Sequence, residues 1–166
     1  LDKELSELKE PRKHYQTYFS SPSANVDLMN SSQGIHQFLR AYYHHKSADW
    51  SDNQPFTLTS WDAKIMAQMP TYYIMHHGQT MPETVASEMP NEKQIKSCEW
   101  LTELELQVYA SEYSKNTFQG GLQWYRCAAE GINQPALSLF AGQRILVPTL
   151  FLSGKWVDIR IGFLLF

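Results

Sequence analysis

A single short apolar run near the C-terminus, Thr149 to Leu152, most constrains how this chain can fold. Preceded by Pro148 and followed closely by a glycine, it is typical of a strand buried on both faces of a parallel sheet. No other segment resembles a companion strand, and an isolated strand leaves its backbone N–H and C=O groups without partners. The sequence therefore predicts a mostly α-helical body with one orphan strand, whose sheet we expect to be missing from this sequence.

Residues 2–143 show a helical pattern with frequent interruptions. We expect Pro11 to open a helix over 12–20 and Ser60 to cap a helix over 61–69. Thr102 and Glu105 form a Thr-x-x-Glu capping box before a further long helix. Residues 71–80 are ambiguous between loop and turn.

The longest clear helix is predicted to begin at Ser31 or Ser32. Its apolar residues recur at helical spacing and form one stripe. The members of this stripe are Ile35, Phe38, Leu39, Tyr42 and Tyr43. By default such a stripe belongs to the core.

Composition and charge exclude several classes of function. The 166 residues, 43% hydrophobic, suffice for one domain with a sizeable core. The net charge of −3 gives no electrostatic support for nucleic-acid binding. Lys155, Asp158 and Arg160 interrupt the apolar end before the ~18 apolar residues of a membrane helix, so we expect no membrane association. The first residues are charged and show no signal peptide, which favours a cytoplasmic location.

Common catalytic and metal-binding patterns are absent from the sequence. His44-His45 and His76-His77 are adjacent pairs, and neighbours on a helix point roughly 100° apart, which is poor for shared metal ligation. There is no G-x-S-x-G serine motif and no G-x-x-x-x-G-K phosphate loop. We therefore expect no metal site.

The stretch "FQGGLQWYRC", residues 118–127, places two glycines before an aromatic pair. A glycine inside a helix costs ~1 kcal/mol against alanine, so the pair calls for a reason. One interpretation is that the glycines let a helix begin close to a site, where Tyr125 presents its hydroxyl. The alternative is an ordinary core helix with two buried aromatic residues.

Two tyrosine motifs resemble those of a known family. "HYQTYF" (14–19) and "GGLQWYR" (120–126) are similar to the two cap-domain motifs of α/β-hydrolase-fold epoxide hydrolases, and "VPTLFLSGK" resembles the core strand that follows the cap. The resemblance implies a helical cap (lid) domain over residues 1–143, a core strand over 144–155 and a divergent apolar tail over 156–166.

The same resemblance implies the chemistry of the site. In that family two cap tyrosines point into the active site, and the matching residues here are Tyr15 and Tyr125. A phenol with a pKa near 10 stays protonated at neutral pH and can donate to the oxygen of an opening epoxide. Gln16, Phe19 and Trp124 are then expected to shape the pocket, although burial in the core explains Phe19 and Trp124 equally well. The implied partner is a small apolar epoxide, and no cofactor is implied.

The sequence also departs from the family. The family's nucleophilic aspartate precedes the cap and its histidine follows the core strand, and neither is found here. Asp158 is the only nearby candidate for the acid of the triad, and it stands two positions late. We therefore expect this chain alone to be inactive. The competing reading is a non-catalytic helical module that binds a small apolar ligand or a protein partner, with self-association through the tail, Ile161 to Phe166.

Overall fold

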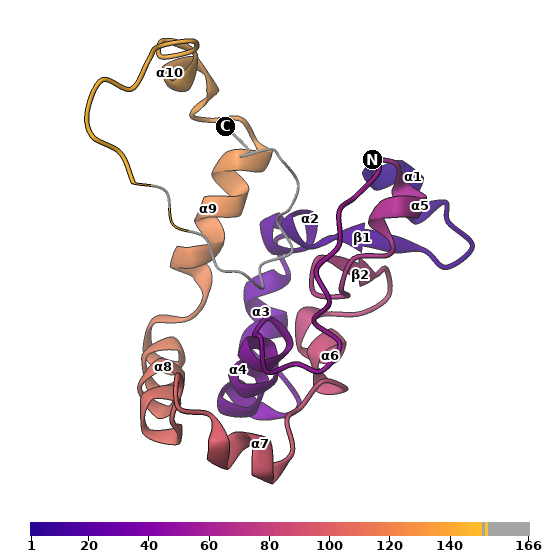
Figure 1. The fold of residues 1–166 in the computed structure, drawn as a ribbon, viewed down its shortest axis with the longest axis vertical. Helices are drawn as coiled ribbons and strands as arrows, with labels where there is room; N and C mark the ends of the chain where they lie inside the picture. The colour runs from indigo at the N-terminus through magenta and orange to yellow at the C-terminus, as the bar shows by residue number, and fades with distance from the viewer. Residues whose placement is uncertain (151, 153–166) are drawn as a thin grey trace.

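The computed structural model describes residues 1–150 and 152, and twelve helices and strands lie among them (Figure 1). The helices are α1 (Asp2–Ser6), α2 (Tyr15–Ser20), α3 (Ala24–Met29), α4 (Gly34–His45), α5 (Ala63–Met66), α6 (Met81–Ala86), α7 (Glu92–Ser97), α8 (Glu103–Asn116), α9 (Gln119–Ala129) and α10 (Gln134–Ser138). The strands are β1 (Arg12–His14) and β2 (Ile74–His76). This largely helical content is compatible with a cap domain.

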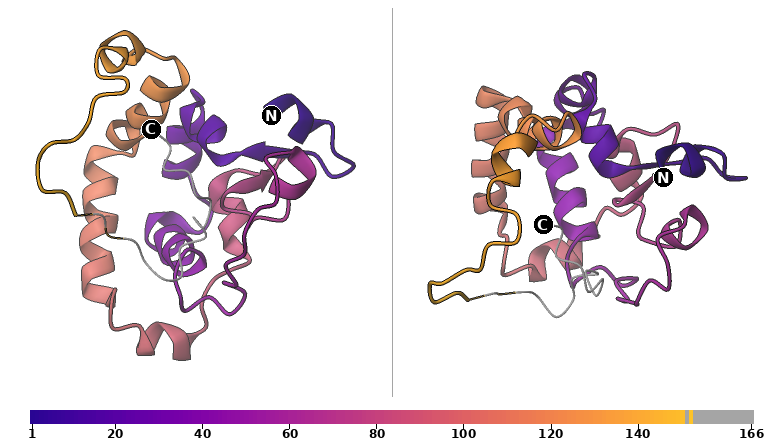
Figure 2. Two further views of the ribbon diagram at one scale, coloured as in Figure 1. Left: turned by 45° about the horizontal axis from the view of Figure 1, so that its top comes forward. Right: turned by 90° about the horizontal axis from the view of Figure 1, so that it is seen from above.

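Helix α4 is the centre of the packed body. It packs against α8 on one side and α6 on the other, and the β1–β2 sheet lies on the side of α4 away from α8 (Figures 1 and 2). The predicted apolar stripe explains this position, because Phe38 and Leu39 are buried in the main core. Around them the core also takes Leu106 of α8 and Leu122 of α9. The helix thus buries its apolar face, as the stripe predicts.

The N-terminal segment corrects two expectations. Residues 12–14 form a strand rather than the first turn of a helix, and pair antiparallel with 74–76 in the register Arg12↔His76, Lys13↔Met75, His14↔Ile74. The segment 71–80, ambiguous in sequence, therefore contains strand β2, the antiparallel partner of β1. Ile74 and Met75 are fully buried, and pairing satisfies the backbone groups that burial removes from water.

The helix predicted over 12–20 begins instead at Tyr15, as α2. His14 is its N-cap, and the His14 Nδ1 accepts a hydrogen bond from the backbone N–H of Gln16 at 3.3 Å. The change from strand to helix therefore falls immediately before Tyr15, the candidate donor of the first motif.

The capping predictions were right at α8 and wrong at α4 and α5. The helix predicted to begin at Ser31 or Ser32 begins at Gly34, after Gln33, and has no side-chain cap hydrogen bond. Thr102 caps α8 with both hydrogen bonds of the capping box to Glu105, as predicted. The helix expected after Ser60 is only α5, and its cap is Asp62, whose carboxylate accepts from the N–H groups of Lys64 and Ile65. A carboxylate two residues further along the chain replaces the serine as the cap.

The chain after α9 leaves the packed body (Figures 1 and 2). Helix α10 buries no residue, and Leu146 is 89% exposed. Among the described residues 144–150 and 152 there is no strand, because no neighbouring strand pairs with this segment. The predicted core strand stays a prediction, and Phe151, residues 153–155 and the tail with Asp158 lie outside the described residues.

Within the described part of the chain, no helix is both long enough and apolar enough to cross a membrane.

Candidate functional site

The rings of Tyr15 and Tyr125, one from each tyrosine motif, meet edge to face. Their centroids are 5.9 Å apart and their planes are inclined by 79°. Phe19, one turn after Tyr15 on α2, contacts both rings, with centroids 6.1 Å from Tyr15 and 5.1 Å from Tyr125. Helices α2 and α9 pack against each other. The fold therefore brings the rings of Tyr15, Tyr125 and Phe19 into one cluster.

Polar contacts from α2 and α3 hold helix α9 in this position. The Arg126 guanidinium donates to the carbonyl of Ser21 at 3.3 Å. The Asn25 side-chain oxygen accepts from the backbone N–H of Phe118, just before α9, at 3.0 Å. These two bonds lie on either side of Tyr125 along α9, so they fix where its ring can point.

The Tyr15 hydroxyl is arranged as a donor. The side-chain amide of Gln16 donates to the Tyr15 oxygen at 3.3 Å. An amide NH₂ group only donates, so the phenol accepts this bond and keeps its own proton for another acceptor. Gln16 itself is exposed, so it orients the phenol from the solvent side.

The Tyr125 hydroxyl stays protonated over a wide pH range. Burial, followed by the nearby phenols of Tyr42 and Tyr15, raises the pKa of Tyr125 to about 12. Desolvation disfavours the phenolate, because a charge loses more hydration than a neutral hydroxyl. At neutral pH Tyr125 is therefore a hydrogen-bond donor.

Tyr125 and Phe19 form part of the wall of an aromatic cavity with a volume of about 210 Å³. The remaining wall comes from α3, α4, α8 and the start of α9. Its residues are Leu28, Phe38, Leu39, Tyr42, Tyr43, Tyr113, Phe118, Gly121 and Leu122. No Asp, Glu or His is among these residues. The cavity can therefore bind an apolar group and offer it phenol donors, but no described residue of its wall can act as a carboxylate nucleophile.

Gln16 and Trp124 do not reach this aromatic cavity. They line a separate, more polar hollow of about 380 Å³, with Asp2 and Thr17, on the other side of Tyr125. Trp124 is 79% exposed, so the interpretation of a core helix with two buried aromatic residues is wrong for Trp124. Of the three predicted pocket residues, only Phe19 belongs to the aromatic cavity.

Sequence reasoning missed the tyrosines that α4 contributes. Tyr42 and Tyr43 belong to the predicted apolar stripe, yet both line the aromatic cavity and also a second hollow, which contains Lys46. Burial raises the pKa of Tyr42 well above its usual range. The signal that could have found them is the double tyrosine at the end of the stripe, since a buried tyrosine usually carries its hydroxyl toward a polar partner.

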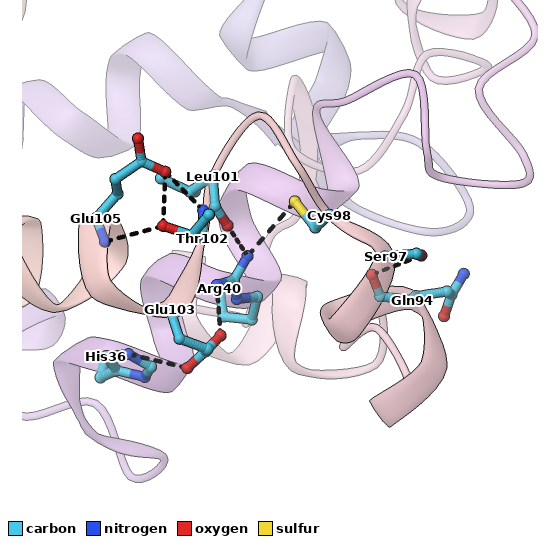
Figure 3. A network of polar contacts seen from close by, with 9 residues as sticks. All are labelled: His36, Arg40, Gln94, Ser97, Cys98, Leu101, Thr102, Glu103 and Glu105. Atoms are coloured by element: carbon cyan, nitrogen blue, oxygen red, sulfur yellow. Dashed lines mark hydrogen bonds and ion pairs between the residues drawn. The ribbon is translucent and has the colours of Figure 1, made fainter.

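A buried arginine fixes α4 against the start of α8 (Figure 3). Arg40 is 3% exposed, donates to the carbonyl of Leu101 at 3.0 Å and pairs with the carboxylate of Glu103. The Nε2 of His36 lies 3.5 Å from the other carboxylate oxygen of Glu103. Since Tyr42 and Tyr43 stand two and three residues after Arg40 on α4, this network sets the position of one wall of the cavity.

No group of three or more His, Cys, Asp or Glu side chains that could hold a metal ion occurs among residues 1–150 and 152.

Comparison with known proteins gives one partial similarity. The chain is 38% identical over 55 residues to Epoxide hydrolase A of Mycobacterium tuberculosis. The matched segment covers 33% of this chain and 16% of that relative. No protein-family profile and no solved structure matches the chain. Over a third of its length, then, the chain is distantly similar to an epoxide hydrolase.

Proposed function

We propose that this chain is the cap region of an α/β-hydrolase-fold protein that opens epoxides, with Tyr15 and Tyr125 as donors to the epoxide oxygen. The observation that carries the proposal is the edge-to-face contact of these two tyrosines, of which Tyr125 lines the aromatic cavity and Tyr15 does not. The partial similarity to an epoxide hydrolase supports the same reading.

The chemistry suits two protonated phenols. Opening an epoxide ring moves negative charge onto its oxygen, so hydrogen-bond donors aimed at that oxygen lower the barrier. The Gln16 bond leaves the Tyr15 proton available, and burial keeps the Tyr125 proton in place. The apolar part of the epoxide then occupies the aromatic cavity, where it is removed from water.

The attacking group has to come from elsewhere in the protein. The wall of the aromatic cavity holds no carboxylate among the described residues. In the proposed mechanism, therefore, these residues supply binding and electrophilic assistance, and an aspartate outside them forms the ester intermediate that water hydrolyses.

The test is turnover of styrene oxide by the full-length protein carrying Tyr15→Phe, Tyr125→Phe or both. Each single change is expected to lower kcat by about 10²- to 10³-fold, the usual cost of losing one oxyanion donor. Phenylalanine keeps the ring packing, so the fold should be retained. Tyr109→Phe is the matched control, because Tyr109 is a half-exposed tyrosine on α8 outside the wall of the cavity. Unchanged turnover in the double variant would contradict the proposal.

The second candidate is a non-catalytic module that binds a small apolar ligand or a protein partner. The absence of acidic and histidine side chains from the described cavity wall favours it. In that case the protein should bind styrene oxide without converting it, and the two Tyr→Phe changes should leave binding unaltered.

A further inference from the structure

Neither glycine of the "GGLQWYR" motif is required by the backbone or by packing. Gly120 and Gly121 lie in the first turn of α9, and neither has a positive φ. A Cβ built at either position meets no atom within 4 Å. The expectation that these glycines allow a close approach thus finds no support among the described residues. Glycine is among the least favourable helix residues, so its presence still calls for a reason.

The helix period places the two glycines on different faces. Gly121 stands three residues after Phe118 and four before Tyr125, and residues at these spacings share one face. All three line the aromatic cavity. Gly120 stands four residues before Trp124, which is 79% exposed, and it is not part of the cavity wall. Both positions have open space around the Cβ, but only the space at Gly121 adjoins the aromatic cavity.

We propose that Gly121 sets the size of the ligand that this cavity accepts, and that the ligand class is a small molecule with one aromatic ring. This inference rests on the proposed function, in which the ring carries the epoxide toward Tyr125. The wall around Gly121 consists largely of aromatic side chains, including the stacked pair Tyr113 and Phe118, whose centroids are 4.2 Å apart. Aromatic walls favour a flat aromatic guest, through edge-to-face and offset contacts.

The volume of the cavity limits the guest. At about 210 Å³ it is smaller than the roughly 300 to 1,000 Å³ typical of sites for drug-sized ligands. A single ring with a short substituent fits such a space, because a cavity of roughly 150 Å³ already holds benzene. A side chain at position 121 would take part of that space, and its Cβ would meet no atom within 4 Å outside the neighbouring backbone of α9.

A size-limiting role and a structural role predict opposite results for one substitution. Gly121→Ala adds a better helix former in open space, so the midpoint of thermal unfolding should rise by roughly 2 to 4 °C. The same methyl group should weaken binding of an aromatic ligand. Gly120→Ala should raise the unfolding midpoint by a similar amount and leave binding unchanged, because it lies outside the cavity.

The experiment compares Gly121→Ala and Gly121→Leu with the matched variants Gly120→Ala and Gly120→Leu in the whole chain. Binding of styrene oxide and of the smaller propylene oxide is measured by ligand titration followed by NMR, and folding by circular dichroism. Gly121→Leu is expected to weaken styrene oxide binding by about ten-fold or more, because the added side chain and the aromatic ring would compete for the same space. Propylene oxide binding should change by less than about two-fold, because the smaller molecule leaves the added volume free. If Gly121→Leu does not fold, Gly121→Ala provides the same comparison with a smaller expected loss.

The outcomes separate this inference from the proposed function. Equal styrene oxide binding in the wild-type chain and the Gly121 variants, or an equal loss in the Gly120 variants, would overturn the role of Gly121 alone. A loss of styrene oxide binding specific to the Gly121 variants, together with unchanged styrene oxide turnover by the full-length protein that carries both Tyr15→Phe and Tyr125→Phe, would support the role of Gly121 and count against the proposed function. A wild-type chain that binds no styrene oxide would overturn both.

Discussion

The Nζ of Lys46 donates a hydrogen bond to the Tyr42 hydroxyl at 3.2 Å, one helical turn along from it. The same ammonium lies 4.8 Å from the centroid of the Tyr42 ring and 5.4 Å from that of Tyr72. An ammonium only donates, so the Tyr42 oxygen accepts and its proton remains available to a third group. Tyr42 is thus a further phenol donor in the wall that contains Tyr125.

Removing the Lys46 ammonium should lower the stability of the fold around Tyr42. Lys46→Met is expected to lower the free energy of unfolding by about 1 kcal/mol, because it removes the hydrogen bond and the cation–π contacts. Lys46→Arg should keep most of the stability, since a guanidinium also stacks on aromatic faces. Urea unfolding measures both. Lys96→Met is the control, because Lys96 pairs with Glu92 on an exposed surface. An effect of Lys46→Met no larger than that of the control would show that the contacts contribute nothing.

Tyr125 should titrate late among the tyrosines of this chain. Burial raises its pKa to about 12, so its phenolate should appear only in strongly alkaline solution. Carbon-13 labelling of the tyrosine rings allows each hydroxyl to be followed by NMR, and Tyr125→Phe identifies the signal. The fold favours the neutral phenol, so its contribution to stability is present below the unfolded pKa near 10 and is lost as the pH rises through about 12. Titration near 10 would mean that the hydroxyl is hydrated in solution.

Acid should destabilise the fold through His45. This side chain is 1% exposed, its Nδ1 has no hydrogen-bond partner among the described residues, and its ring packs against Trp50 with centroids 4.4 Å apart. Burial, opposed in part by the charge of Glu88, lowers the pKa of His45 to about 4. The unfolded chain therefore binds the proton first, and stability present above about 6.5 is lost as the pH falls toward 4.

The expected size of this loss is on the order of 2 kcal/mol between about pH 7 and pH 5, at 1.36 kcal/mol per pKa unit. Urea unfolding at a series of pH values measures it. His44 and His14 also have lowered pKa values, caused by burial, and add a slope of the same sign. His45→Phe keeps a ring in place and should remove only the share due to His45. An unchanged slope in this variant would assign the acid sensitivity to the other histidines.

Removing Arg40 should cost more than neutralising its partner. Arg40→Met leaves the Leu101 carbonyl without its donor and should lower stability by about 1 to 3 kcal/mol. Glu103 is half-exposed, so Glu103→Gln should cost only about 0 to 1 kcal/mol. Thermal or urea unfolding of the two variants gives the comparison, with the exposed Glu112→Gln as control. Equal losses for the two changes would show that the ion pair, rather than the buried carbonyl contact, holds α4 to α8.

Local structure was predictable where local hydrogen bonds decide it. Thr102 and Glu105 marked the start of α8 correctly, because a capping box satisfies backbone N–H groups within one turn. The stripe over Ile35 to Tyr43 likewise predicted α4 and the burial of Phe38. Both signals depend on residues three or four apart.

The sequence by itself also predicted a largely helical body and identified the two tyrosine motifs, with Tyr15 in one and Tyr125 in the other. Only the tertiary structure decided that residues 12–14 form a strand, because their partners, 74–76, lie far along the chain and the pairing satisfies backbone groups that no local pattern reveals. It alone decided that Tyr42 lines the cavity and that Trp124 faces solvent, since the face that a helix buries depends on what packs against it. The space left at Gly121 likewise arises only where α9 meets α3, α4 and α8.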